Sequence, residues 1–186
     1  HAEATGIGQH IDMALLDTQV AMLANLGANY LVKGKSEGKV PGRSGNAHAN
    51  IVPYQMFEVK ALPENNGAPT EKDYLILAVG NDKQFSKFCD VAGRPDLAKD
   101  SLYATNQNRV RNRKQLIPIL EQIMLCRSKQ EWLDVLNEAQ IPCGPINKFS
   151  EVFTDPQVLA RQMVNHHHHP LNAHVALVAN PIKLSA

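Results

Sequence analysis

The chain has 186 residues, 44% of them hydrophobic, and 19 Lys and Arg stand against 18 Asp and Glu, for a formal net charge of +1. This length and apolar content exclude a disordered chain and suit one domain, or one domain with pieces of another. A nearly neutral and interspersed charge pattern predicts no nucleic-acid partner and no membrane surface, because both partners attract a basic field.

Cys89, Cys126 and Cys143 form no Cys-x-x-Cys pair. We therefore expect neither a disulfide framework nor a zinc ribbon, and we expect a reducing compartment. The predicted location is cytoplasmic, or mitochondrial if the source is eukaryotic. Cys126 is interpreted as part of a helix core rather than as a nucleophile, since no Gly-x-Cys elbow surrounds it.

A long helix is predicted over residues 11–32. Apolar side chains lie around its whole circumference, so we expect it to be buried on nearly every side. Asp12 and Asp17 interrupt the apolar run, which leaves it shorter than the ~18 residues that a membrane span requires. The rest of the chain suffices for a compact unit of its own, so the cover of this helix is expected in protein outside this chain, which is interpreted as a fragment.

Residues 34–50 have the composition of a linker, with several glycines, Pro41 and cationic side chains. Two strands are predicted next, over residues 51–59 and 74–79, because both segments are rich in β-branched and aromatic residues. A long irregular turn over residues 61–72 joins them, as Pro63, Gly67 and Pro69 indicate.

Helices are predicted to dominate the second half of the chain. Asn81, with Gln84 three residues later, is typical of an N-cap, and Ser128 with Glu131 forms a capping-box pattern. The helix that follows Asn81 ends before Gly93; the others cover residues 108–127, 128–139 and 157–163. A last strand over residues 174–178 completes the order, which predicts an α+β fold rather than alternating βαβ units.

The run His166 to His169 raises the question of a metal site, because neutral imidazoles bind zinc, copper and nickel. Four adjacent residues cannot all face one ion with tetrahedral geometry. We therefore expect a solvated loop here, and we predict neither a metal site nor a resident cofactor.

The segment from Gly42 to His48 is the more promising site. Glycines such as Gly42 and Gly45 let backbone N–H groups approach a ligand closely, and Arg43 offers a charge to an anionic one. A solvated connector accounts for the same composition equally well.

Several strings together resemble the class III CoA-transferase family, which includes formyl-CoA transferase, carnitine CoA-transferase and the α-methylacyl-CoA racemases. In chain order the strings are TGIGQHIDMALLD (5–17), RSGNAH (43–48), PYQMF (53–57), LAVGND (77–82), GRP (93–95), IPCGPIN (141–147), DPQ (155–157) and NPIKLS (180–185). No single string is specific, but the ordered set spans nearly the whole chain.

The resemblance implies a large α/β domain built from both ends of a longer chain, with a small α+β domain inserted between them. It assigns residues 1–33 to the C-terminal helix of the large domain's N-terminal part and residues 34–50 to the linker and its glycine-containing loop. Residues 51–150 would form the small domain, and residues 151–186 would return toward the large domain. It also implies an interlocked homodimer.

The resemblance further implies covalent catalysis, in which an Asp carboxylate attacks an acyl-CoA thioester and aspartyl-anhydride and aspartyl-CoA intermediates follow. Coenzyme A is then a substrate, and the partners are an acyl-CoA and a carboxylic acid acceptor. The family's catalytic Asp lies upstream of the Gly6-x-Gly8 segment, and neither Asp12 nor Asp17 matches it. We therefore predict no catalytic residue in this chain, and no activity of the chain alone.

Two groups of residues are carried over from the family as site candidates. Gly42, Arg43, Gly45, Asn46 and His48 resemble the glycine-rich loop that closes over the active-site Asp, although the loop here is not a run of glycines. The string PYQMF matches a stretch that approaches CoA, which makes its residues Tyr54, Gln55 and Met56 the CoA-adjacent candidates.

Two other functions stay open. One is an acyl-CoA racemase of the same fold, for which His48 is the only matching acid or base. The other is a non-catalytic interaction module, against which the apolar helix over residues 11–32 argues.

Overall fold

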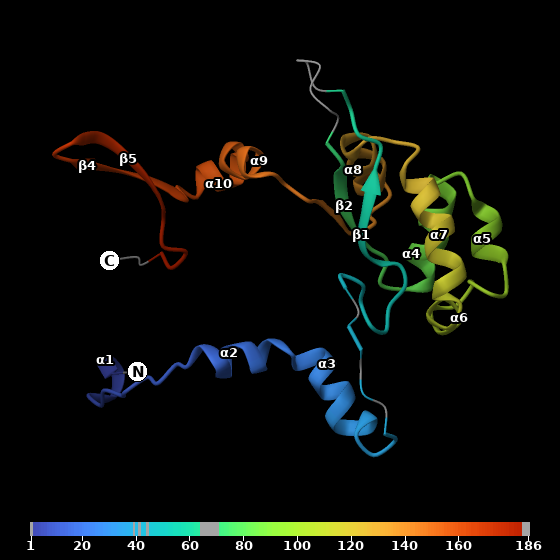
Figure 1. Ribbon diagram of the computed structural model, residues 1–186, viewed down its shortest axis with the longest axis horizontal. Coiled ribbons are helices and arrows are strands. Elements are labelled where there is room, and N and C mark those ends of the chain that lie inside the picture. The colour runs from blue at the N-terminus through green and yellow to red at the C-terminus, as the bar shows by residue number, and fades with distance from the viewer. Residues whose placement is uncertain (1, 39, 41, 44, 64–70, 184–186) are drawn as a thin grey trace.

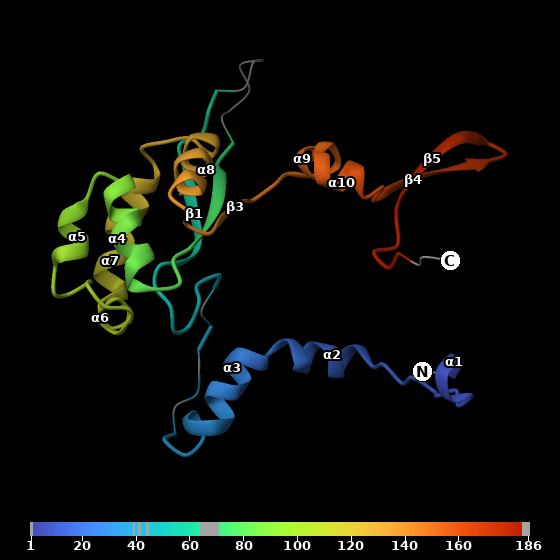
Figure 2. The same ribbon diagram turned by 180° about the vertical axis from the view of Figure 1, so that it is seen from behind.

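The computed structural model describes residues 2–38, 40, 42, 43, 45–63 and 71–183 (Figure 1). A central α+β unit holds a three-stranded sheet and a group of helices, and two extensions leave it on the same side, as both views show (Figures 1 and 2). The predicted mixed α+β fold is confirmed. Residues 64–70 of the predicted 61–72 turn, and Ser44, lie outside the described part.

The central sheet is antiparallel and has the strand order β1-β2-β3. Its strands are β1 (Tyr54–Val59), β2 (Asp73–Ala78) and β3 (Cys143–Pro145). Phe57 of β1 lies opposite Leu75 of β2, and both side chains are buried. The two predicted strands are confirmed, whereas the short strand β3 was not predicted, because three residues carry too little periodicity.

The helical layer consists of α4 (Asp82–Val91), α5 (Pro95–Lys99), α6 (Asn106–Arg111), α7 (Arg113–Met124) and α8 (Lys129–Glu138). Its apolar faces and one face of the sheet form a single core, which includes Phe57, Leu75, Leu77, Phe85, Phe88, Leu116, Leu120, Met124, Trp132 and Leu136. Trp132 Nε1 donates a hydrogen bond to Met124 O at 2.8 Å, which fixes α8 against the end of α7.

Both predicted capping motifs are confirmed. Asn81 Oδ1 accepts a hydrogen bond from Gln84 N at 2.9 Å, and the Gln84 side chain accepts one from Gly80 N at 2.8 Å. Ser128 and Glu131 form a reciprocal capping box at the start of α8. The bond from Ser128 N lowers the pKa of the Glu131 carboxyl, as a hydrogen bond to the charged form does.

The single helix predicted over residues 108–127 is wrong in one respect, because two helices occupy the region. Thr105 caps α6 through a hydrogen bond from Asn108 N, and Asn112 separates α6 from α7. Pro118 lies inside α7, which continues past it. Cys126, expected in a helix core, follows the end of α7 and is exposed.

The N-terminal extension corrects the prediction of one long helix. It contains α1 (Ala2–Thr5), α2 (Leu15–Met22), α3 (Ala24–Asn29) and a π-helical turn η1 (Tyr30–Gly34), while residues 11–14 are not helical. Within this chain its apolar side chains are exposed, Leu15 by 86% and Met22 by 80%, which agrees with the expectation that their cover lies in protein outside this chain. Short helices without a packing partner are only marginally stable in water, which explains an interrupted segment here.

The C-terminal extension contains α9 (Phe149–Thr154), α10 (Pro156–Ala160) and a hairpin of β4 (Val164–His169) and β5 (Asn172–Val178). The Asp155 side chain caps α10, with Pro156 at its first position, and the helix predicted over residues 157–163 ends earlier, at Ala160. The solvated loop predicted for His166 to His169 is wrong: the run is most of strand β4. Backbone pairing with β5, which the predicted strand over residues 174–178 forms, imposes this conformation.

One lysine links the C-terminal extension to the central unit. Lys129 Nζ lies 3.0 Å from Asp73 Oδ1 and 2.8 Å from Glu151 Oε1. Burial acts to lower the pKa of Lys129, but the bonds to Glu151 and Asp73 outweigh it and raise that pKa. The same bond lowers the pKa of Glu151, so this ion pair persists in weak acid.

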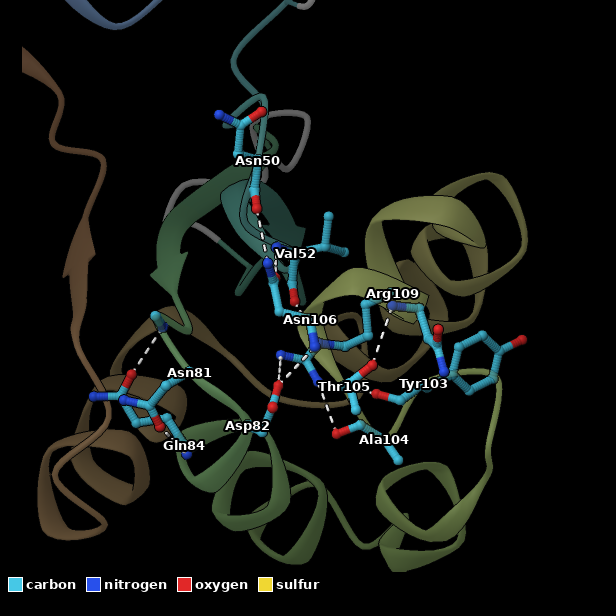
Figure 3. Close-up of polar contacts among 12 residues, drawn as sticks. Asn50, Val52, Asn81, Asp82, Gln84, Tyr103, Ala104, Thr105, Asn106 and Arg109 are labelled. Carbon is cyan, nitrogen blue, oxygen red and sulfur yellow. Dashed lines mark hydrogen bonds and ion pairs between the residues drawn. The ribbon is translucent and has the colours of Figure 1, made fainter. Parts of the chain in front are cut away.

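A buried arginine connects the helices to the segment that leads into β1 (Figure 3). The Arg109 side chain is fully buried and lies over the Phe85 ring, with its guanidinium carbon 4.3 Å from the ring centroid. Its acceptors are the backbone oxygens of Val52 (2.6 Å), Tyr103 (2.9 Å) and Ala104 (3.3 Å), and Asp82 Oδ1 (2.8 Å). Burial lowers the pKa of Arg109, and the Asp82 carboxylate opposes that effect.

None of the helices in the described residues is long and apolar enough to cross a membrane.

Replacing Arg109 by Met should lower the free energy of unfolding by about 3 kcal/mol or more, because at least two buried carbonyl groups lose their donors. Urea denaturation of the chain, followed by Trp132 fluorescence, measures this change. Arg111 provides the matched control, since it lies on the same helix and is exposed. Arg111→Met should change the stability by less than about 0.5 kcal/mol; an equal loss in both variants would contradict the role given to Arg109.

Candidate functional site

The candidate site is the segment of residues 45–50, which we call the edge loop, together with the strand β1 that comes after it in the chain. His48 N donates a hydrogen bond to Tyr54 O at 2.8 Å, and Met56 N donates one to Asn46 Oδ1 at 3.1 Å. Because β2 pairs with the other side of β1, these bonds cover the edge of β1 that the sheet leaves open. The structure thus brings together residues that the sequence suggested as two separate groups.

The edge loop begins with a turn that requires glycine. Gly45 has a φ of +61°, a left-handed conformation that side chains with a Cβ rarely adopt. The turn directs Asn46 toward Met56 of β1. The backbone conformation alone therefore accounts for the glycine at position 45, and no bound ligand is needed to explain it.

The His48 ring is held by two contacts. It stacks on Tyr54 with the centroids 5.2 Å apart and the planes 16° apart, and its Nδ1 accepts a hydrogen bond from Asn50 N at 3.1 Å. A neutral imidazole that accepts at Nδ1 carries its proton on Nε2. In this arrangement neither ring nitrogen has a free lone pair, so His48 is not placed to act as a base.

Two side chains from the helices anchor the backbone of the edge loop. Arg113 Nη2 donates to His48 O at 2.6 Å and to Ala49 O at 3.1 Å. Asn106 Nδ2 donates to Asn50 O at 2.8 Å, and Asn106 Oδ1 accepts a bond from Val52 N at 3.1 Å (Figure 3). The loop is therefore fixed to the same helical layer that Arg109 joins to Val52.

Sequence reasoning missed Asn106, Arg109 and Arg113. All three lie at polar positions that are typical of ordinary exposed residues of a helix, and each of them bonds at least one backbone atom more than 50 residues earlier. Thr105, a capping residue, is the one local signal that α6 starts here. This capping residue does not predict which side chains of the helix are buried.

Gly42 and Arg43 precede the anchored loop, and both are exposed. The structure therefore divides the predicted 42–48 segment into an exposed front part and a base that is bonded to β1. The exposed Arg43 guanidinium is available to an anion in solution or on a ligand.

A hollow of about 420 Å³ lies between the edge loop, β1 and α7. It is lined by Asn46, Gln55, Met56, Phe57, Glu58, Tyr74, Glu121, Gln122 and Leu125. Two of these side chains are carboxylic acids, and none of the lining residues that the structure describes is cationic. This hollow therefore suits a neutral polar group better than a phosphate.

Cysteine and metal chemistry have little support at this site. Burial, together with the nearby Asp90 charge, raises the pKa of the buried Cys89 thiol to about 12, so the thiol stays protonated and unreactive. Burial also raises the pKa of Cys143. Within the described ranges, no group of three or more His, Cys, Asp or Glu residues is arranged to hold a metal ion.

Comparison with known proteins identifies the family. The model of CoA-transferase family III matches residues 1–186, so the chain belongs to this family. It is 44% identical over 161 residues to a succinate–glutarate CoA-transferase of Agrobacterium fabrum, covering 87% of this chain and 36% of that protein. It is 37% identical over 181 residues to the human succinyl-CoA:glutarate CoA-transferase, covering 97% of this chain and 38% of that protein.

A solved structure agrees with this assignment. The crystal structure of a CAIB/BAIF family protein from Brucella suis matches with a TM-score of 0.71 and 41% identity, over 99% of this chain and 43% of that chain. The chain thus spans about two fifths of the length of the proteins that it matches.

Replacing Asn46 by Ala should free the edge loop from β1, because Met56 N then loses its acceptor. Amide hydrogen exchange at Met56 should speed up about fivefold to tenfold, as expected for a hydrogen bond worth about 1 kcal/mol. Asn50→Ala is the matched control, since the described bonds of Asn50 come from its backbone. Unchanged exchange at Met56 in Asn46→Ala would contradict the proposed anchoring.

Proposed function

We propose that this chain is part of an acyl-CoA:carboxylate CoA-transferase and forms the small-domain side of its active-site cleft. Family membership supports the reaction class, and the relatives named above are CoA-transferases. The observation that carries the proposal is the edge loop, whose base is bonded to β1 while Gly42 and Arg43 stay exposed in front of it.

The proposed reaction uses a nucleophile outside this chain. An Asp carboxylate attacks the thioester carbonyl of the acyl-CoA donor, and the C–S bond breaks to give an aspartyl anhydride and CoA thiolate. The thiolate then attacks the aspartyl carbonyl, which releases the donor acid and leaves an aspartyl-CoA thioester. The acceptor carboxylate collects the CoA by the reverse of these two steps, which regenerates the Asp.

In this proposal the front part of the segment 42–48 lies over the acyl group. Glycine at position 42 permits close backbone approach, and a cover over the anhydride excludes the water that would hydrolyse it. Arg43 meets the acceptor carboxylate through a charge-assisted hydrogen bond, commonly worth about 1.5 to 3 kcal/mol. The anchored base of the loop keeps this cover in position during repeated turnovers.

Tyr54, Gln55 and Met56 are proposed to contact the neutral pantetheine arm of CoA rather than its phosphates. The hollow beside Gln55 and Met56 contains Glu121 and also Glu58, which is paired with Lys72 Nζ at 2.7 Å, so the Glu121 carboxylate is the charge that would repel a phosphate. Amide groups such as those of pantetheine pair well with Asn and Gln side chains.

The acceptor is proposed to be a dicarboxylic acid of four or five carbons. The names of the Agrobacterium and human relatives specify succinate and glutarate or their CoA esters. A second carboxylate on the acceptor gives Arg43 a charge to bind while the first carboxylate reacts. We further propose that the enzyme acts as a homodimer, in which protein outside this chain covers the exposed apolar side chains of α2 and α3.

The racemase alternative has weaker support. It requires a base beside the α-carbon of the acyl group, and His48 is the only candidate in this chain. The bond from Asn50 N occupies Nδ1 of His48, and the ring stacks against Tyr54. A non-catalytic interaction module is disfavoured by the family assignment.

The test is an assay of the longer protein that contains this chain. With succinyl-CoA as donor, glutarate should become glutaryl-CoA, which liquid chromatography of the CoA esters detects directly. The 186-residue chain alone should form none. Turnover by the chain alone, or epimerisation of a 2-methylacyl-CoA without a carboxylic acid acceptor, would contradict the proposal.

Arg43→Ala in the same longer protein tests the role of the loop. The Michaelis constant for glutarate should rise about tenfold or more, while that for succinyl-CoA should change much less. Lys99→Ala is the control, because Lys99 lies on α5 of the helical layer, far along the chain from the edge loop. An unchanged Michaelis constant and an unchanged turnover would remove Arg43 from the site.

A further inference from the structure

Strand β4 arranges the histidine run in a way that the sequence alone does not show. Successive side chains of a strand point to opposite faces, so His166 and His168 share one face and His167 and His169 share the other. All four are exposed. The objection that adjacent histidines cannot face one ion therefore does not apply to a pair two residues apart.

We propose that His166 and His168 form a two-imidazole binding site for a divalent transition-metal ion of the Cu²⁺ or Zn²⁺ type. This site lies on the β4–β5 hairpin.

The register irregularity of the hairpin falls at His168, between His167 and His169, and β4 contributes a single residue there. His167 lies opposite Val175 and His169 lies opposite Asn172, so the extra residue of the irregularity belongs to β5 and not to β4. Side chains two positions apart on a regular strand are roughly 6.8 Å apart at their bases. Two imidazoles that lean toward each other from that spacing can both reach one ion at about 2.0 to 2.1 Å.

The other pair is less suited to bind a metal. His169 Nδ1 accepts a hydrogen bond from Leu171 N at 3.2 Å. A neutral His169 in this bond carries its proton on Nε2, so it has no lone pair to offer. A metal at His167 would then have one imidazole ligand, whereas a metal at His166 and His168 would have two.

The surroundings favour a borderline ion over Ca²⁺ or Mg²⁺. His166 lines a hollow of about 550 Å³ whose other lining residues are apolar: Phe153, Leu159, Val164, Ala176, Leu177 and Val178. No carboxylate lines it among the described residues, whereas Ca²⁺ and Mg²⁺ prefer oxygen ligands. Imidazole suits Cu²⁺ and Zn²⁺, and water molecules would complete the coordination of an exposed two-ligand site.

The test is a titration of the untagged 186-residue chain with ZnCl₂ and CuCl₂ by isothermal calorimetry. One ion per chain should bind saturably, with Cu²⁺ tighter than Zn²⁺. Replacing His168 by Asn should weaken binding about tenfold or more, because one of two ligands is lost. His167→Asn is the matched control, since it alters an adjacent exposed residue on the opposite face, and it should change the affinity less than about twofold.

Imidazole ¹⁵N NMR of the unmodified chain gives a second measurement that needs no variant. Zinc should shift the ring nitrogens of His166 and His168 and leave those of His169 in place. The proposal is overturned if binding is not saturable, if His167→Asn and His168→Asn weaken it equally, or if zinc shifts all four rings alike. The last two outcomes would show non-selective binding by a histidine-rich strand.

Discussion

A buried positive charge organises the central unit. Arg109 sits in the apolar core beside Phe85, and such a charge is tolerated only when its donors are satisfied. Its partners come from three separate places: the segment before β1, the start of α4 and the residues before α6. Because one guanidinium binds acceptors from all three places, it fixes the position of the segment that enters β1 relative to the helices.

The candidate site depends on that entry point. Asn106 and Arg113, on either side of Arg109 along the chain, bond the backbone between His48 and Val52. The base of the edge loop is thus attached to a rigid helical layer, while Arg43 in front of it is free to meet a ligand. In the proposed function, this fixed base supports the part of the segment that covers the acyl group.

The features that the sequence predicts correctly are local. The caps at Asn81 and Ser128 need only residues three positions away, and both form as expected. The failures involve distant partners: pairing with β5 turns the histidine run into a strand, and the interrupted helix after residue 14 lacks a packing surface in this chain. The composition of residues 42–48 and the family resemblance both indicate a site candidate there, but neither predicts the anchors at Asn106 and Arg113, because their partners lie more than 50 residues earlier.

The most direct test of this account is amide hydrogen exchange in the Asn106→Ala variant. Asn106 has no charge and contacts the segment before β1 through its side chain alone. Its replacement by Ala therefore loosens the loop but removes no apolar side chain from the core. The account predicts that exchange at Val52 and His48 speeds up about tenfold or more, while that at Trp132 in α8 stays as in the unmodified chain. Unchanged exchange at Val52 and His48 would contradict the claim that the helical layer holds the edge loop in place.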